Sequence, residues 1–589
     1  MNGGLGLSQG HRALAAAGAI ALAWCCYGIA TIHQHGVTLD ETSIFYGGDR
    51  TLFFLTHPTV PGALALQQGG EPQGFHSRFP RFPDFADTWH YPVLPGLLMS
   101  LTNALFHEGL GWVDDLDGHH LGLILWHGVG LFAFGFYACR LLGLRAGACA
   151  ALAYALYPSI VGFAFNNPKD LPATDFYGAT LLAAAAGLSQ RRPRDLWAAG
   201  VLCGLSLASK LNGVFALTTL AVWLLGTGRL SRTARSELRA DRLWTPLCAL
   251  PVVAFGVFWL TWPWLWFGTP LDWVSRLLEY ARFYLVFSHS ARPTFTLFAF
   301  KAVFAMTPPL VLALAALGLG YLFTRRCALR PLRRLFLLWL MLPLLRITLP
   351  FSEFYDANRH FIEYIGALCA LAGIGAGAVL ELLDRLPRAR ALQATAVAAM
   401  TYVLWLPLRD YRPYEGAYFN GFVGGLGGAQ AQALFFMQAP PHDSRASGAE
   451  GDFWNSSLRD ALELARQIVP AGATLATCGP SSVNVQANLT APVRYSFANW
   501  RDPHADYIYF MARECYCKQS DLRHAEEERP VIVRVTRGGG LIYEILGPKV
   551  PYALPPVSPH TRYEQLPHYP TRRAPPPRRP ARRVPQTSP

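Results

Sequence analysis

Long apolar segments alternate with short arginine-rich clusters through about the first four hundred residues of the chain. A helix needs about 20 apolar residues to cross a hydrocarbon core of about 30 Å, and most of these segments are near that length. Loops rich in Lys and Arg normally stay on the cytoplasmic side of a membrane, so an even number of spans must separate neighbouring clusters. The clusters lie at residues 140–145, 191–194, 229–242, 325–334 and 385–390.

This parity rule decides how many times each ambiguous segment crosses the membrane. Residues 196–226 lie between two clusters, so we interpret them as two short spans broken near Lys210. Residues 92–107 are short, start with prolines and would make the count odd, so we place them in the membrane interface. The N-terminus is then cytoplasmic, and the region after the last span is extracytoplasmic. The eleven predicted spans are residues 12–31, 119–142, 145–165, 171–189, 196–209, 213–226, 243–262, 296–322, 335–350, 361–383 and 390–408.

The composition agrees with a membrane protein and argues against a nucleic-acid partner. Hydrophobic residues make up 52% of the chain and charged residues only 15%, whereas soluble proteins carry about 25% charged residues. The net charge of +13 comes largely from arginines beside apolar segments or in the C-terminal tail. The arginines beside the apolar segments are explained by the preference of positive loops for the cytoplasmic side, so we expect no nucleic-acid binding.

The chain after the last span has the mixed composition of a small soluble domain. Residues 1–409, with a long first outer loop at 32–118, form the predicted membrane domain, and residues 410–548 form the predicted α/β domain. A helix is predicted over 453–469, and residues 549–589 are rich in Pro and Arg and predicted to be disordered. We expect the α/β domain to stabilise the protein or to dock an acceptor. Its predicted strands are residues 474–477, 493–497, 507–511, 531–536 and 541–546.

The chemically versatile residues gather in the loops that this topology places outside. Asp40 and Glu41 follow the first span closely, where a carboxylate could accept a proton from an attacking hydroxyl or amine. A solvated acidic pair would look the same in the sequence. His33, His35 and His57 lie in the same loop, and imidazoles with carboxylates suit several divalent metals. Metal dependence therefore stays open.

Four cations lie at the outer ends of predicted spans. A cation at this depth costs free energy unless it is paired, and Lys and Arg are the usual partners of phosphate oxygens. Any one of them could simply extend to the lipid head groups, but four on one face favour a shared anion site. These cations are Lys169, Lys210, Arg346 and Arg359.

Several of these residues fall in motifs whose order along the chain is informative. The motifs are Val37-Thr-Leu-Asp-Glu41, His90-Tyr-Pro-Val-Leu94, Phe165-Asn-Asn-Pro-Lys-Asp170, Ser209-Lys-Leu-Asn-Gly213, Tyr355-Asp-Ala-Asn-Arg-His-Phe361, Tyr418-Phe-Asn-Gly-Phe-Val-Gly-Gly425 and Asp452-Phe-Trp-Asn-Ser-Ser457. In this order they resemble the membrane-integrated C-type glycosyltransferases, specifically family 39. That family contains protein O-mannosyltransferases and the lipid A aminoarabinose transferase.

The resemblance implies a fold, a reaction and a location. The expected fold is an α-helical polytopic membrane protein of the C-type, with about eleven transmembrane helices and the α/β domain outside. The implied reaction moves a hexose or pentose from a polyprenyl-phosphate donor to an acceptor, with inversion, at the outer face of the bacterial inner membrane. The acceptor stays open among a protein, lipid A and a surface polysaccharide. A flippase of lipid-linked sugars and a non-catalytic envelope assembly protein are the alternatives.

The resemblance also assigns roles to residues. Asp40 is the implied catalytic base, and Glu41 its neighbour in organising the site. The implied ligands of the donor phosphate are His90, Lys169, Lys210 and Arg359. Further candidates for the site are Asp170, Arg346, Asp356 and His360.

Overall fold

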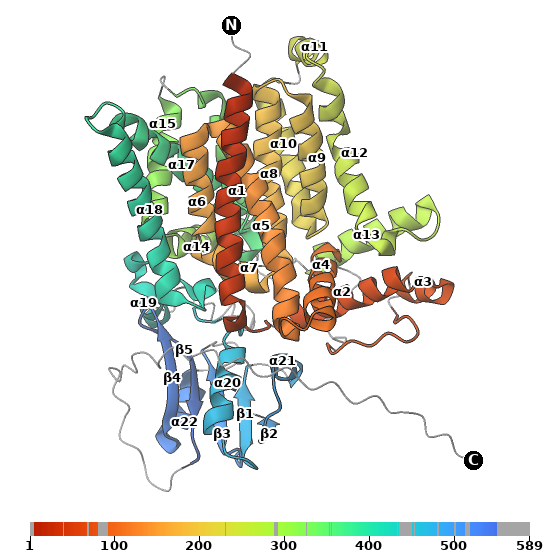
Figure 1. Ribbon diagram of the computed structural model, residues 1–589, viewed down its shortest axis with the longest axis vertical. Coiled ribbons are helices and arrows are strands. Elements are labelled where there is room, and N and C mark those ends of the chain that lie inside the picture. The colour runs from red at the N-terminus through yellow and green to blue at the C-terminus, as the bar shows by residue number, and fades with distance from the viewer. Residues whose placement is uncertain are drawn as a thin grey trace.

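The computed structural model of the protein is a helical bundle with a small sheet domain at one end (Figure 1). The structure describes residues 5–38, 40–67, 70–79, 92–229, 231–287, 293–324, 327–352, 354, 356–432, 434, 450–452, 454–479, 482–499, 502–512 and 519–549. The predicted disordered tail, residues 549–589, lies almost wholly outside this part of the chain.

Every predicted span coincides with a helix or a pair of helices. These are α1 (Leu5–Thr31), α5 (Asp115–Leu142), α6 (Leu144–Ala155), α7 (Pro158–Asn166), α8 (Asp170–Ser189), α9 (Pro193–Leu207), α10 (Val214–Gly226), α12 (Trp244–Leu260), α14 (Phe298–Met306), α15 (Pro309–Phe323), α16 (Arg333–Thr348), α17 (Tyr364–Leu383) and α18 (Ala389–Tyr411). The predicted class, a helical membrane protein with a small C-terminal α/β domain, is confirmed. Among the described residues, four helices are long and apolar enough to cross alone, or up to seven spans if bent pairs are counted. The count of eleven therefore stays a prediction.

Two predicted spans are bent rather than continuous. The axes of α6 and α7 differ by 57°, and those of α14 and α15 by 112°. A proline follows each break, and proline both lacks an N–H group and drives the preceding residue out of the helical region. Tyr157 and Thr307 precede these prolines and have extended backbones. The predicted span at residues 296–322 therefore consists of two helices, α14 and α15, that meet at a sharp bend.

Small residues let the central helices approach closely. α8 and α17 are buried along most of their length. A Cβ atom at Gly318 of α15 would lie 1.9 Å from the carbonyl oxygen of Leu371 in α17, and one at Gly375 would lie 2.1 Å from that of Leu314. Only glycine fits at these two positions, as is typical of helix pairs packed inside a membrane.

The outer loops form short helices around the end of the bundle that carries the sheet domain. The first loop contains α2 (Glu41–Thr56), α3 (Val60–Gln67), α4 (Leu94–Asn103) and a π-helical turn (Ala104–Gly109). Residues 92–107, predicted to lie in the interface, thus form α4 and this turn. α13 (Pro270–Phe287) projects sideways from the bundle, as Figure 1 shows, and exposes Leu271 and Leu285.

The C-terminal domain contains a five-stranded mixed sheet in the order β2-β1-β3-β5-β4. β1 lies parallel to β2 and β3, whereas β5 lies antiparallel to β3 and β4. Gly538 and Gly539 form the predicted hairpin turn with positive φ angles of 52° and 75°, which glycine adopts without strain. The elements of this region are α19 (Gly425–Ala431), α20 (Leu458–Ile468), β1 (Thr474–Cys478), α21 (Ser482–Ala487), β2 (Ser496–Asn499), β3 (Tyr507–Met511), α22 (Gln519–Glu528), β4 (Val531–Arg537) and β5 (Gly540–Leu546). All five predicted strands are present.

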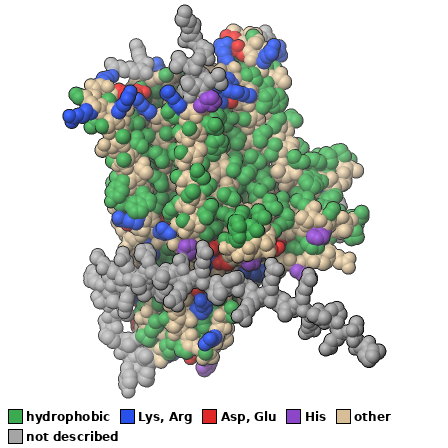
Figure 2. All heavy atoms as spheres, in the orientation of Figure 1, with side chains coloured by type: hydrophobic (Ala, Val, Ile, Leu, Met, Phe, Trp, Pro, Cys, Tyr) green, Lys and Arg blue, Asp and Glu red, His purple; other side chains and the backbone are tan. Residues whose placement is uncertain are grey.

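Charge is distributed unevenly between the two ends of the bundle. Figure 2 shows a broad hydrophobic belt, with many Lys and Arg side chains at the end opposite the sheet domain. The arginine-rich helix α11 (Arg232–Ala240) lies at this end (Figure 1). The clusters that were used for counting spans therefore lie mainly together, as the parity argument requires.

Candidate active site

Asp40 lies in the turn that begins α2, with its side chain only 14% exposed. Its carboxylate does not cap the helix. Instead, one oxygen, Oδ2, accepts a hydrogen bond of 2.9 Å from Nη1 of Arg359 and lies 3.3 Å from Nζ of Lys169. A single carboxylate oxygen is thus held between two cations.

Three separate loops supply this cluster. Asp40 comes from the first outer loop, Lys169 from the link between α7 and α8, and Arg359 from the 3₁₀ turn η7 (Arg359–Phe361) before α17. All three loops lie at the end of the bundle that faces the sheet domain (Figure 1). The structure therefore brings together three residues that the sequence analysis selected from distant motifs.

The two cations determine the charge of Asp40. Burial alone would disfavour the ionised carboxylate, but the positive charges and hydrogen bonds of Lys169 and Arg359 outweigh it and hold the pKa of Asp40 below its usual value. Asp40 is therefore an anion at neutral pH. Its negative charge reduces the repulsion between the two neighbouring cations, Lys169 and Arg359.

A second ion pair lies behind this cluster. Lys210 forms an ion pair with Asp170. Asn167 fixes Asp170 from both sides: its Oδ1 accepts the backbone N–H at 2.9 Å, and its Nδ2 donates to the carboxylate at 3.1 Å. Lys210 is thus paired with a carboxylate other than Asp40.

His360 lies among the cations as a neutral side chain. Burial, and then the charges of Arg359, Lys210 and Arg346, lower the pKa of His360 well below its usual value. Its Nε2 accepts a hydrogen bond of 3.3 Å from Nε of Arg359. Arg346 donates to the backbone carbonyl of His360 and lies 3.4 Å from Glu363. Asp356 lies 3.5 Å from Nε of Arg359. The four further candidates, which are Asp170, Arg346, Asp356 and His360, are therefore all near the Asp40 cluster or linked to it.

Glu41 faces away from the cations. Its side chain is fully buried: Oε2 accepts the backbone N–H of Thr38 at 2.7 Å, and Oε1 lies 3.1 Å from Nε2 of His120 in α5. Glu41 therefore anchors the loop that carries Asp40 and does not contact Lys169 or Arg359. The predicted phosphate ligand His90 lies outside the described residues.

The structure also bears on the metal-binding candidates. Within the described part of the chain, no group of three or more His, Cys, Asp or Glu side chains is arranged to hold a metal ion. His35 is buried, and its ring stacks on the ring of Phe165 with 3.5 Å between the two ring centroids.

Trp454 is a neighbour of the cluster that the sequence analysis did not assign. Its ring lies 4.8 Å from the guanidinium carbon of Arg359, a cation–π contact. Its indole N–H donates to Asp356 at 3.1 Å, and Asp356 lies 3.5 Å from Nε of Arg359. The segment 452–457 had been noted as a motif, but nothing in it indicates a contact with a loop about one hundred residues earlier.

Residues 90–262 match the protein family described as dolichyl-phosphate-mannose-protein mannosyltransferase. This segment belongs to a C-type glycosyltransferase family. The resemblance predicted from the ordered motifs is therefore confirmed. The matched segment contains Lys169 and Lys210, whereas Asp40 and Arg359 lie on either side of it.

Three solved structures that the chain matches are distant from it in sequence. ArnT from Cupriavidus metallidurans bound to undecaprenyl phosphate is 17% identical, with 91% of this chain and 98% of that chain covered and a TM-score of 0.45. The Archaeoglobus fulgidus oligosaccharyltransferase, solved with zinc and sulfate, is 13% identical, with 90% and 72% covered and a TM-score of 0.44. The arabinofuranosyltransferase AftD from Mycobacteria is 13% identical, with 91% and 40% covered and a TM-score of 0.40. No curated protein sequence matches the chain significantly.

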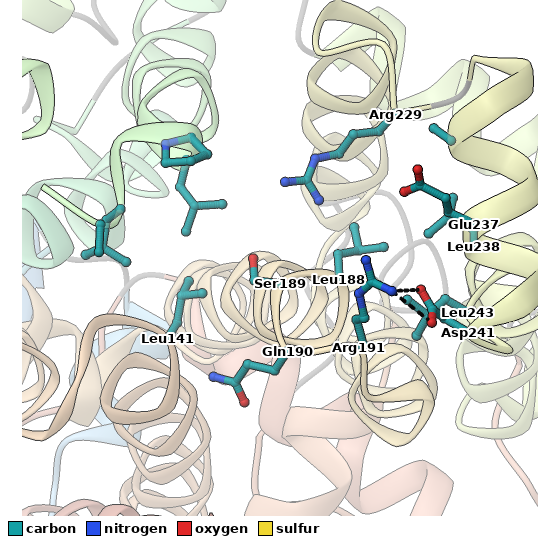
Figure 3. A pocket seen from close by; sticks show the side chains of 15 residues that line it. Leu141, Leu188, Ser189, Gln190, Arg191, Arg229, Glu237, Leu238, Asp241 and Leu243 are labelled. Carbon is teal, nitrogen blue, oxygen red and sulfur yellow. Dashed lines mark hydrogen bonds and ion pairs between the residues drawn. The ribbon is translucent and has the colours of Figure 1, made fainter. Parts of the chain in front are cut away.

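A cavity of about 510 Å³ lies at the other end of the helical bundle. Figure 3 shows Arg191 paired with Asp241 there, and the side chain of Arg229 beside them. α8 runs from Asp170, next to Lys169, to Ser189, which lines this cavity, and a helix of that length spans about 30 Å. The cavity is therefore separate from the Asp40 cluster.

Proposed function

We propose that this glycosyltransferase moves a sugar from a polyprenyl-phosphate donor to an acceptor at the extracytoplasmic face, with inversion and with Asp40 as general base. The observation that carries the proposal is the position of Asp40 Oδ2 between Lys169 and Arg359, at 3.3 and 2.9 Å. This arrangement places a buried carboxylate beside two cations, Lys169 and Arg359, that can bind phosphate oxygens.

Each group has a distinct role in the proposed reaction. The acceptor hydroxyl or amine forms a bond to the anomeric carbon of the sugar, and its proton passes to the carboxylate of Asp40. The bond from the anomeric carbon to the phosphate oxygen breaks on the opposite side, which inverts the configuration. Negative charge grows on the departing phosphate, so Lys169 and Arg359 stabilise the transition state more than the ground state.

The lowered pKa of Asp40 also links donor binding to the strength of the base. Lys169 and Arg359 both stabilise the ionised carboxylate of Asp40, which makes it a weak base. A donor phosphate brings its own negative charge to Lys169 and Arg359 and competes for them. The pKa of Asp40 then rises towards its ordinary value, so the base becomes effective only when the donor is bound.

Two observations support an extracytoplasmic site. Many of the arginines lie at the opposite end of the bundle (Figure 2), as expected of the cytoplasmic end. Cys478 in β1 of the sheet domain is disulfide-bonded, and disulfides persist in oxidising compartments such as the bacterial periplasm. We therefore place the sheet domain outside the inner membrane and the N-terminus in the cytoplasm.

The family match supports a lipid-linked donor. The description of that family names a dolichyl-phosphate-linked mannose and a protein acceptor. For this chain we propose only the wider class, a sugar on a polyprenyl phosphate. The proposed acceptor classes are a protein, lipid A and a glycan.

The test compares envelope glycoproteins and glycolipids from a deletion strain by mass spectrometry. Reintroducing the intact gene should restore a sugar that the deletion strain lacks, and the Asp40→Asn variant should not. The control is Asp384→Asn, which alters an exposed carboxylate in the link between α17 and α18. If no glycan differs between parent and deletion strains, the proposed function is wrong. If Asp40→Asn restores the sugar fully, Asp40 is not the base.

A further inference from the structure

The sheet domain makes direct contact with the arginine of the candidate active site. Trp454, in the segment leading into α20, is 5% exposed. One face of its ring lies 4.8 Å from the guanidinium carbon of Arg359, and its N–H donates to Asp356 at 3.1 Å. Because Asp356 also faces Nε of Arg359 at 3.5 Å, Trp454 restricts the guanidinium both by stacking and through this carboxylate.

The loop that Trp454 contacts has an unfavourable backbone. Asp356 and Ala357 have positive φ angles of 55° and 57°. Residues other than glycine rarely adopt this left-handed conformation, because the Cβ atom then lies too close to the following carbonyl oxygen. Such strain persists only where surrounding contacts hold it. The hydrogen bond from Trp454 to Asp356 is one of those contacts.

A second contact holds the chain just before Asp40. The side-chain amide of Asn488, which follows α21, accepts the backbone N–H of Val37 at 2.7 Å and donates to its carbonyl at 2.9 Å. Asn484 of α21 donates to the carbonyl of Thr38 at 3.2 Å. The sheet domain therefore binds the peptide backbone two and three residues before the proposed base.

The backbone at Gly36, four residues before Asp40, is tightly packed against the sheet domain. A Cβ atom at Gly36 would lie 2.6 Å from Oδ1 of Asn488 and 2.8 Å from the carbonyl oxygen of Ser456. Gly36 also donates its N–H to Ser456 at 3.3 Å. The segment that leads to Asp40 is thus enclosed between the start of α20 and the end of α21.

We propose that the C-terminal domain is part of the catalytic apparatus, in which Trp454 positions Arg359 and Asn488 positions the backbone that carries Asp40. This inference rests on the proposed glycosyltransferase function. Neither residue touches the reacting atoms, so both are positioning residues. Small misplacements matter, because an error of about 1 Å in an active site can reduce the rate about a hundredfold.

A positioning role differs from simple stabilisation in its effect on pH dependence. If Arg359 loses its place, Asp40 loses part of the positive charge that favours its anion. The acidic limb of the kcat/KM profile should then move to higher pH. A variant that only reduces the amount of folded enzyme lowers the rate equally at every pH. The charged and titratable groups around Asp40 are Lys169, Arg359, Asp356, His360, Asp170 and Lys210.

The first test measures sugar transfer by the purified full-length protein carrying Trp454→Ala or Trp454→Phe. For Trp454→Ala we expect kcat to fall at least about tenfold, with a smaller change in the KM for the donor. The acidic limb of its kcat/KM profile should move to higher pH. Trp454→Phe keeps the aromatic face but not the N–H, so it should recover part of kcat. The matched control is Trp197→Ala, which removes a 42% exposed tryptophan from α9 and should match the parent protein.

The second test uses Asn488→Leu, which keeps the number and branching of the side-chain heavy atoms but cannot form the two hydrogen bonds to Val37. Gln486→Leu makes the same change to an exposed side chain in α21 and is the control. We expect Asn488→Leu to lower kcat at least about tenfold in protein that elutes as a monodisperse peak. An unchanged kcat and an unchanged pH profile in both Trp454→Ala and Asn488→Leu would overturn the inference.

The outcomes separate this inference from the proposed function. If the parent protein transfers no sugar from any polyprenyl-phosphate donor, the function fails and the positioning role fails with it. If the parent is active and the variants lose rate at every pH with no shift of the acidic limb, the function stands and the domain only stabilises the fold. If Trp454→Ala and Asn488→Leu do not fold, the pH profile of the milder variant Trp454→Phe decides between the two roles.

Discussion

The guanidinium of Arg359 lies 2.9 Å from the carboxylate of Asp40, although 319 residues separate them in the sequence. Asp40 starts a helix of the first outer loop, whereas Arg359 lies just before α17. The pair therefore exists only when the two ends of the membrane domain are folded against each other. It also joins the proposed base to a proposed phosphate ligand, so a change to either residue affects the other.

Arg359→Gln should reduce sugar transfer strongly. The variant lacks one of two cations that stabilise the departing phosphate, and loss of one such group typically costs about 10²- to 10³-fold in kcat. Arg359→Lys should recover only part of the rate, because lysine cannot contact Asp40 and Asp356 through a planar fork. Steady-state kinetics with Arg145→Gln as control, an exposed arginine at the start of α6, measure the effect. Parental activity in Arg359→Gln would remove it from the site.

The ion pairs of Asp40 should also contribute to stability in a pH-dependent way. Its folded pKa is lower than the unfolded value, which is about 3.9. The contribution is therefore fully present above the unfolded pKa and is lost as the pH falls through the folded pKa. Thermal unfolding in detergent should show the parent more stable than Asp40→Asn at pH 7, with the difference persisting to about pH 4. A difference that disappears already near pH 6 contradicts the lowered pKa.

The helices and strands could largely be predicted because they depend on local patterns. Residues 171–189 were predicted as a span and form α8 from Asp170 to Ser189, since an uninterrupted apolar run leaves few alternatives. The hairpin at Gly538–Gly540 was likewise predicted from turn chemistry. The break before α15 was missed, although Pro308 and Pro309 indicate it, because charge parity counts crossings and is insensitive to a bend.

The partners within the site could be predicted only in part. Charge parity placed Asp40, Lys169 and Arg359 on one face because sidedness follows from loop composition. It could not tell which cation pairs with which carboxylate, since that depends on side-chain directions in the folded loops. Glu41 shows the difference, because it is adjacent to Asp40 in sequence yet faces His120. Trp454 was beyond sequence reasoning, since it reaches Arg359 only through docking of the sheet domain.

Glu41→Gln should weaken the fold more than the chemistry. Glu41 is buried against His120 and the backbone of Thr38, and loss of a charged hydrogen bond of this kind costs about 1.5–3 kcal/mol. We expect a lower thermal midpoint and a kcat per folded molecule within about threefold of the parent. Unlike leucine at position 488, glutamine at position 41 keeps an oxygen that can accept the N–H of Thr38 and hold the loop. A thermal shift assay and kinetics on monodisperse protein measure the two effects. A loss of kcat as large as that of Asp40→Asn would instead make Glu41 a catalytic residue.

Docking of the sheet domain should depend on Arg459. This α20 side chain is 7% exposed and lies 2.7 Å from both Asp114 and Asp117 at the start of α5. Removing one partner of a buried ion pair leaves an uncompensated charge and typically costs about 3–5 kcal/mol. Arg459→Gln should therefore loosen the domain and speed both proteolysis in the link after α18 and hydrogen exchange in α20.

The control for this prediction lies on the same helix. Arg466 of α20 is 40% exposed and forms an ion pair within its own helix, at 3.3 Å from Glu463. Arg466→Gln should therefore cost at most about 0.5 kcal/mol. If Arg459→Gln is cleaved at the rate of the parent, its ion pairs do not hold the domain. If it is cleaved faster and its acidic limb also moves to higher pH, loosening the whole domain has the same effect on Asp40 as removing Trp454. That result would join docking and positioning in one mechanism, because the contacts of Trp454 and Asn488 form only in the docked domain.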